Sequence, residues 1–72
     1  MSTVRFLRTF VAVARHGSLA AAAERVALTQ AAVSLQMRAL EAELRRDLFG
    51  RTGRTVTLNA NGRALLPQAE HL

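Results

Sequence analysis

The feature that most constrains this chain is the short gap between two segments with helical periodicity. The first segment, residues 19–26, has its apolar face at Leu19, Ala22, Ala23 and Val26. The second begins after Thr29, a good helix N-cap, and has its apolar face at Val33, Met37, Leu40 and Leu44. About three residues remain for the turn, and two helices joined so closely predict a helix-turn-helix. Because unrelated helical bundles can share this spacing, the prediction needs support from other features.

A third amphipathic segment precedes this pair. Over residues 4–14 the apolar side chains recur every three or four positions, at Phe6, Leu7, Phe10, Val11 and Ala14. Ser2 or Thr3 can cap the start of this helix, and Gly17 can adopt the positive φ that ends it. Ser18 can then cap the next helix. The pattern therefore predicts a core of three helices.

After the third helix the pattern changes to that of a β-hairpin. Residues 50–54 are rich in glycine and arginine, and residues 55–58 alternate threonine with Val56 and Leu58. A short hairpin with a basic tip at this place would form a wing beside the third helix. The fold class that we expect is therefore mainly α, a winged helix-turn-helix with a three-helix core.

A last helix is predicted after the hairpin. Asn59 can cap it, and one face of it carries Leu65, Ala69 and Leu72. Gly62 and Pro67 lie inside this pattern, so we expect its first turns to be weak or kinked.

The composition argues against several classes of protein. Seventy-two residues allow one small domain with one core, which is little for a multi-step enzyme. Four of the five acids lie beside arginines on faces that we expect to be exposed, namely Glu24, Glu41, Glu43 and Asp47. The chain has no cysteine, and His16 and His71 lack the spacing of metal ligands. We therefore expect that the chain is not an enzyme and that it binds no metal ion and no cofactor.

The chain also lacks the pattern of a membrane or secreted protein. Its longest apolar run, residues 19–23, is far shorter than the roughly 20 residues of a membrane span, and the N-terminus has no signal-peptide pattern. We expect a soluble, cytoplasmic protein.

The charge favours a polyanionic partner, above all nucleic acid. The net charge is +5, and every basic residue apart from the histidines is arginine. The excess lies in residues 1–23 and 51–63, each with three arginines and no acid. The exclusive use of arginine is equally well explained by the codon bias of a GC-rich genome, so we draw no chemical conclusion from it.

The order of these motifs resembles the N-terminal domain of LysR-type transcriptional regulators. The resemblance extends over nearly the whole chain without a gap, and it rests on residues 10–14, 17–19, 22–26, 30–37, 40–41, 44, 48–49, 51–54 and 58–62. It implies a winged helix-turn-helix DNA-binding domain over residues 1–58 and the start of a linker helix, which pairs subunits, over residues 59–72. It also implies a separate effector-binding domain. We therefore expect this chain to be an excised fragment of a bacterial regulator, the alternative being a naturally short protein. The full-length regulator would bind inverted-repeat DNA as a homo-oligomer, whereas pairing would be weak or absent in this chain.

Three residues depart from the family's pattern. Ala31 stands where proline is common, and Asn59 replaces a usual threonine but keeps a capping side chain. Leu35 stands where arginine is frequent, which removes a possible contact with a base or a phosphate. The family's contacts with DNA therefore cannot all be transferred to this chain.

The expected recognition helix covers about residues 30–46, and its N-terminal part would face base edges in the major groove. Opposite or beside its apolar face lie Gln30, Ala31, Ser34, Leu35 and Arg38. A glutamine can bond adenine through N6 and N7, and a serine can donate or accept one hydrogen bond. The alternative for Gln30 is an ordinary solvated residue of the first turn, which the surrounding motif makes the weaker interpretation.

Phosphate contacts are expected elsewhere. Ser18 and Thr29 open helices, whose free N–H groups suit a phosphate oxygen, although capping alone explains both residues equally well. Arg51, Thr52 and Arg54 in the wing could contact the DNA backbone or enter a minor groove. A solvated charged turn is the alternative for this segment.

Two other functions remain open at this point. A helix-turn-helix can bind a protein instead of DNA, and binding that falls steeply with salt would distinguish DNA binding from it. The basic first helix could instead bind a membrane surface. This would require the apolar side chains Phe6, Leu7 and Phe10, which the core also needs.

Overall fold

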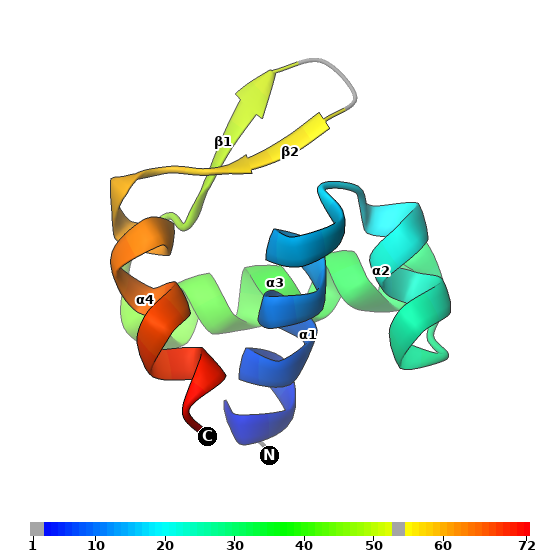
Figure 1. Ribbon diagram of the computed structural model, residues 1–72, viewed down its shortest axis with the longest axis horizontal. Coiled ribbons are helices and arrows are strands. Elements are labelled where there is room, and N and C mark those ends of the chain that lie inside the picture. The colour runs from blue at the N-terminus through cyan, green and yellow to red at the C-terminus, as the bar shows by residue number, and fades with distance from the viewer. Residues whose placement is uncertain (1–2, 53–54) are drawn as a thin grey trace.

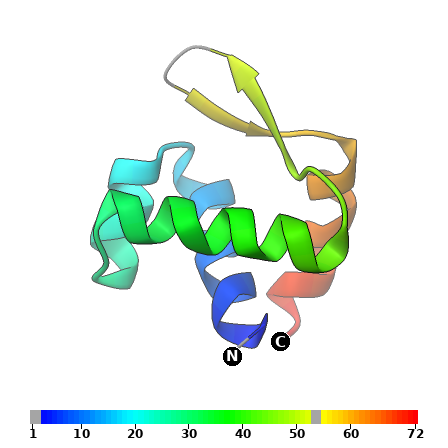
Figure 2. The same ribbon diagram turned by 180° about the vertical axis from the view of Figure 1, so that it is seen from behind.

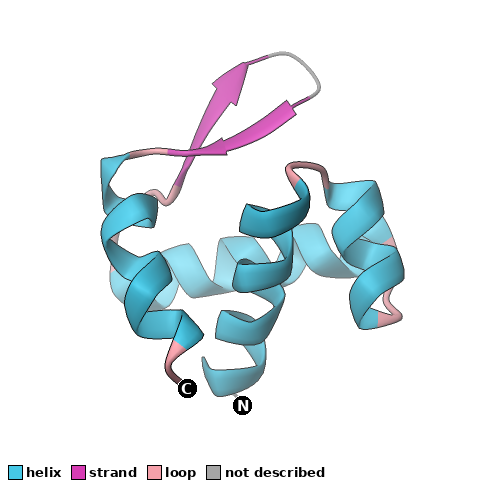
Figure 3. Ribbon diagram, viewed as in Figure 1, coloured by secondary structure: helices cyan, strands magenta, loops and turns pink. Residues whose placement is uncertain are grey.

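The computed structural model describes residues 3–52 and 55–72. Over these residues the elements, in chain order, are α1 (Thr3–His16), α2 (Leu19–Val26), α3 (Gln30–Leu44), β1 (Phe49–Thr52), β2 (Thr55–Leu58) and α4 (Ala60–Glu70). Helices make up the body of the molecule, and the two strands extend from one side of it (Figures 1 and 3). The arrangement is the winged helix-turn-helix that the sequence predicts.

Helix α1 lies at the centre of the core. It packs against α2, α3 and α4, and Phe10 and Val13 on it are fully buried. Helix α2 approaches it closely because Ala22 and Ala23, both buried, are small. The predicted apolar face of α2 is therefore confirmed. That of α1 is confirmed in part, because Phe10 is buried and Phe6, Leu7 and Val11 are half-buried against the core, but Ala12 and Val13 are buried without having been predicted.

Helix α3 buries three of its predicted core residues, Val33, Met37 and Leu40. The prediction that Leu44 belongs to the core is wrong, because 37% of this residue is exposed. The helix also ends at Leu44, two residues earlier than predicted, where Arg45 takes a left-handed conformation. Past this end the chain turns back, and Leu48 supplies the buried side chain instead.

The turn between α2 and α3 lacks the glycine that commonly ends a helix. Ala27 takes the left-handed conformation, with φ 58° and ψ 43°, and its N–H bonds the carbonyl groups of Ala23 and Glu24. Such a conformation is unfavourable for an L-residue with a Cβ. At the end of α1, Gly17 has φ 68°, as predicted.

The strands form an antiparallel hairpin in which Phe49 pairs with Leu58 and Thr52 pairs with Thr55. The hairpin is attached to the helices near its tip, through Val56, and at its base, through Phe49. The Val56 N–H donates to the Gly17 carbonyl at 3.2 Å, and the Phe49 ring lies 5.7 Å from that of Phe10, centre to centre. These contacts hold the predicted wing in place.

Leu48 connects the sheet with α3 and α4. Its N–H donates to Glu41 Oε2 at 2.8 Å, and its carbonyl oxygen accepts from the Asn59 N–H at 2.9 Å. Glu41 is therefore half-buried and structural, which corrects the prediction that it lies on an exposed face. Asn59 caps α4 as predicted, because its Oδ1 accepts from the Gly62 N–H at 2.9 Å.

Helix α4 runs from Ala60 to Glu70 and continues through Pro67. Ala69 is buried and Leu65 half-buried, so this face of α4 packs on the core of its own chain, whereas Leu72 is 64% exposed. The described ends of the chain, in α1 and after α4, lie close together (Figure 1).

Gly62 is expected to tolerate no side chain. A Cβ at this position would overlap the carbonyl oxygen of Leu48, which is backbone and held by a hydrogen bond. Gly62→Ala should therefore lower the free energy of unfolding by at least about 1 to 3 kcal/mol, the usual cost of overpacking. Urea unfolding measures the loss, and Gly50→Ala is the control because a Cβ at Gly50 meets its neighbour at an ordinary 3.4 Å. Equal stability of both variants would contradict this close packing.

Ala27→Gly is expected to stabilise the chain. Glycine avoids the steric cost of the left-handed conformation, which is about 1 to 2 kcal/mol for an L-residue with a Cβ. It loses more backbone entropy on folding than alanine does, which offsets about 0.5 to 1 kcal/mol of that gain. The free energy of unfolding should therefore rise by about 0.5 to 1 kcal/mol. Ala64→Gly, on the exposed face of α4, should instead lower it by about 1 kcal/mol. A lower thermal midpoint for Ala27→Gly would show that Ala27 is not left-handed in solution.

Candidate nucleic-acid interface

Helix α3 has one buried face and one that is open to a partner. Figure 2 shows α3 along the front of the molecule, with α1 behind it and the hairpin above. Four of the predicted contact residues are exposed on it, namely Gln30, Ala31, Leu35 and Arg38, and Ser34 is half-buried. Ala31, Leu35 and Arg38 therefore lie on the side of α3 away from the core, whereas Gln30 is exposed at the start of the helix and Ser34 faces the hairpin.

The start of α3 is fixed by its cap. Thr29 Oγ1 accepts from the Ala32 N–H at 3.1 Å, and the Thr29 carbonyl accepts from the Val33 N–H at 3.0 Å. Ser18 does the same for α2, where its Oγ accepts from the Ala21 N–H at 3.1 Å. Both predicted caps are confirmed, and their contact with phosphate stays a prediction.

A hydrogen bond that the sequence did not indicate sets α3 against α1. Thr9 is buried, and its hydroxyl donates to Gln36 Oε1 at 2.6 Å. The bond joins the inner side of α3 to the middle of α1. The Thr9 hydroxyl also lies 3.2 Å from the Arg5 carbonyl oxygen, so it has a second acceptor on its own helix.

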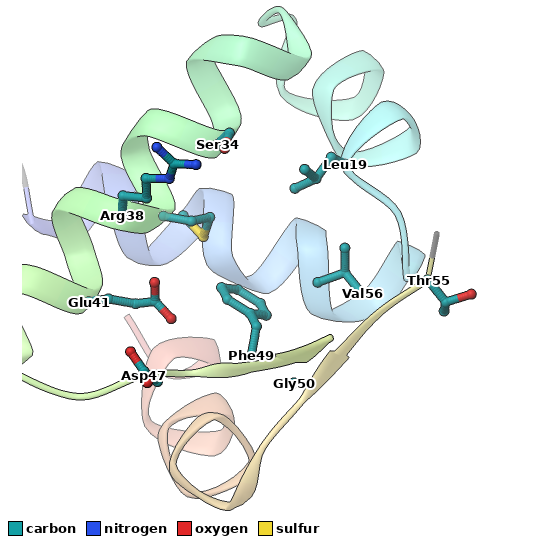
Figure 4. Close-up of a pocket in the computed structure, with 10 residues that line it drawn as sticks. Leu19, Ser34, Arg38, Glu41, Asp47, Phe49, Gly50, Thr55 and Val56 are labelled. Carbon is teal, nitrogen blue, oxygen red and sulfur yellow. The ribbon is translucent and has the colours of Figure 1, made fainter. Parts of the chain in front are cut away.

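A groove of about 400 Å³ lies between α3 and the hairpin. Figure 4 shows Ser34 and Arg38 on its α3 side, with Phe49 and Val56 on the hairpin side. The groove also contains two acids near the end of α3, Glu41 and Asp47, which sequence analysis did not assign to the site. A polyanion would therefore meet Arg38 and the polar Ser34 at one end and repulsion from carboxylates at the other.

The charge along α3 is asymmetric. From residue 25 to residue 40 the sequence has no acid, and Glu41 and Glu43 follow. The Glu43 carboxylate accepts from the Thr3 hydroxyl at 2.8 Å. The half of α3 that is suited to a polyanion is thus its N-terminal half, which carries the predicted contact residues.

The predicted wing residues are described only in part. The backbone of Arg51 and Thr52 lies in β1, where Arg51 pairs with Val56. The side chains of these two residues, and all of Arg54, lie outside the described part of the chain. Their contact with DNA stays a prediction from the sequence.

Two further observations concern other kinds of site. Within residues 3–52 and 55–72, the structure contains no helix long and apolar enough to cross a membrane. The same residues contain no group of three or more histidine, aspartate or glutamate side chains that could hold a metal ion.

Known sequences resemble this chain along most of its length. A family model described as bacterial regulatory helix-turn-helix protein, lysR family, matches residues 4–63. An uncharacterised HTH-type transcriptional regulator of Azotobacter vinelandii is 54% identical over 63 residues, which are 88% of this chain and 44% of that protein. The RuBisCO operon transcriptional regulator of Allochromatium vinosum is 51% identical over 61 residues, 85% of this chain and 20% of that protein. The chain thus spans less than half the length of these relatives.

Solved structures resemble this chain over almost its whole length. The DNA-binding domain of CbnR in complex with DNA has a TM-score of 0.91 and 42% identity, over 99% of this chain and 80% of that one. The BenM DNA-binding domain bound to benA site 1 DNA has a TM-score of 0.90 and 34% identity, over 99% of this chain and 79% of that one. The similarity therefore includes domains crystallised on DNA.

Proposed function

Because the chain belongs to the lysR family of bacterial regulatory helix-turn-helix proteins, we propose that it binds double-stranded DNA sequence-specifically, as the DNA-binding domain of a transcriptional regulator. Helix α3 enters the major groove, and the wing contacts the backbone or the minor groove. The observation that carries the proposal is the outward face of α3, which is exposed and free of acids up to Glu41. The likeness to the CbnR and BenM domains crystallised on DNA supports it.

The contacts divide into two classes. Gln30, Ala31, Ser34 and Leu35 face the bases, because they lie in the first two turns of α3, the part of a recognition helix that enters the major groove. The remaining contacts are made to the phosphates or the minor groove, by Ser18, Thr29, Arg38, Arg51, Thr52 and Arg54. Arg38 is grouped with the base-facing residues by sequence alone, but it lies about two turns into α3, exposed beside the groove under the hairpin, and we therefore assign it to a phosphate.

The assembly that we propose is a homo-oligomer on an inverted-repeat operator, with residues 59–72 as the start of the linker helix that pairs subunits. Two-fold symmetry of the protein then matches that of the site. Because such a regulator acts on the chromosome of a bacterium, we propose that it works in the cytoplasm.

Binding to a protein through the same helix-turn-helix is the alternative. The net charge of +5 and the acid-free half of α3 favour DNA. The test is binding of the chain to duplex DNA at increasing salt, since displaced counterions make the affinity for DNA fall steeply. Binding to DNA that does not depend on salt would contradict the proposal.

Gln30→Ala is expected to reduce specific binding. If Gln30 bonds a base edge, its loss should cost about 1 to 3 kcal/mol on the preferred site and relax the preference at one base pair. Affinity for random duplex should change little. Gln68→Ala, an exposed glutamine on α4, is the matched control and should bind like the wild type. An equal loss on preferred and random duplexes would assign Gln30 to nonspecific binding instead.

Arg38→Ala is expected to weaken binding to all sequences alike. A lost phosphate contact should lower the magnitude of the slope of log K against log salt by about 1, because one counterion fewer is released. Fluorescence anisotropy over a salt series measures the slope. Arg15→Ala serves as the control, because Arg15 lies on α1 and pairs with Glu70 at 3.2 Å, away from α3. If both variants changed the slope equally, Arg38 would contribute only to the overall charge.

A further inference from the structure

Leu35 is the most exposed large apolar side chain among the described residues, at 66%. The other one with similar exposure is Leu72, which lies past the end of α4. Leu35 instead lies within α3, one turn after the first residues of the helix. Fraying of a helix end therefore does not account for its exposure.

The side chain of Leu35 points away from the core. Each residue advances about 100° around a helix, so Leu35 lies about 160° from both Val33 and Met37. Both of these are buried, which fixes the direction of the opposite face. Leu35 thus lies near the centre of the open face of α3.

The neighbours of Leu35 on the helix surface are mostly small. One turn before it lie Ala31 and Ala32, and one turn after it lie Arg38 and Ala39. Among alanines a leucine projects beyond the surface of the helix, and a flat partner can reach it without meeting other bulky side chains. Arg38 adds a positive charge that favours a phosphate-bearing partner.

We propose that Leu35 selects a thymine by packing against its 5-methyl group. The inference rests on the proposed function, in which α3 enters the major groove. There the thymine methyl is the apolar group that a base pair presents, whereas the other major-groove positions are hydrogen-bond donors and acceptors. Leu35 has no group to bond them and would leave them without a partner. One position of the binding site is therefore thymine because of its methyl group.

The test removes that methyl group without changing any hydrogen bond. A preferred site is first selected from random duplexes with the 72-residue chain, and each thymine in it is then replaced singly by uracil. At one position the replacement should weaken binding of the wild type about fourfold, which corresponds to the loss of one buried methyl group. Fluorescence anisotropy measures the dissociation constants.

Variants assign the effect to Leu35. In Leu35→Ala the ratio of the uracil and thymine dissociation constants at that position should fall close to one, and in Leu35→Met it should stay near the wild-type value. Leu35→Ala should fold, since the side chain is exposed and alanine favours helix. Leu72→Ala, with a similar exposure of 64% but outside α3, should keep the wild-type ratio.

The outcomes separate this inference from the proposed function. If a preferred site exists but the uracil ratio is the same in the wild type and in Leu35→Ala at every position, the inference is wrong and sequence-specific binding stands. If selection yields no preferred site, the proposed function fails, and the inference fails with it. Methyl dependence that Leu35→Ala alone abolishes supports both.

Discussion

The arrangement of α3, the hairpin and α4 depends on the backbone of Leu48. Its N–H bonds the carboxylate of Glu41 on α3, and its carbonyl bonds the N–H of Asn59 between β2 and α4. Gly62 packs against the same carbonyl, where a larger residue would not fit. With its side chain buried as well, Leu48 fixes the end of α3, the base of the wing and the start of α4 relative to one another. The face of α3 and the wing can therefore approach a partner as one surface.

The sequence predicts most of the fold because local patterns determine it. The caps at Ser18, Thr29 and Asn59 and the positive φ of Gly17 follow from residue type and spacing. The open face of α3 follows from its buried one, since helical periodicity relates the two. Ala31, Leu35 and Arg38 are exposed for this reason, whereas Gln30 is exposed because it begins the helix, and Ser34 is half-buried beside the hairpin.

The sequence does not predict features that depend on distant contacts. Leu44 continues the apolar spacing of α3 but loses its place in the core to Leu48, because the helix ends and the chain folds back. Glu41 resembles a solvated acid until the Leu48 N–H approaches it. The hydrogen bond between Thr9 and Gln36 joins residues far apart in the chain, and neither position shows a local signal for it.

The way α4 begins also couples the orientation of this helix to that of the hairpin. One residue, Asn59, separates β2 from α4, and its side chain bonds both the first turn of α4 and the Asp47 carbonyl before the sheet, at 2.9 and 2.8 Å. The connection between β2 and α4 therefore allows little relative movement of the two elements. A rotation of α4 would turn the hairpin with it, and such a rotation would first have to break the burial of Ala69 and the ion pair of Glu70 with Arg15.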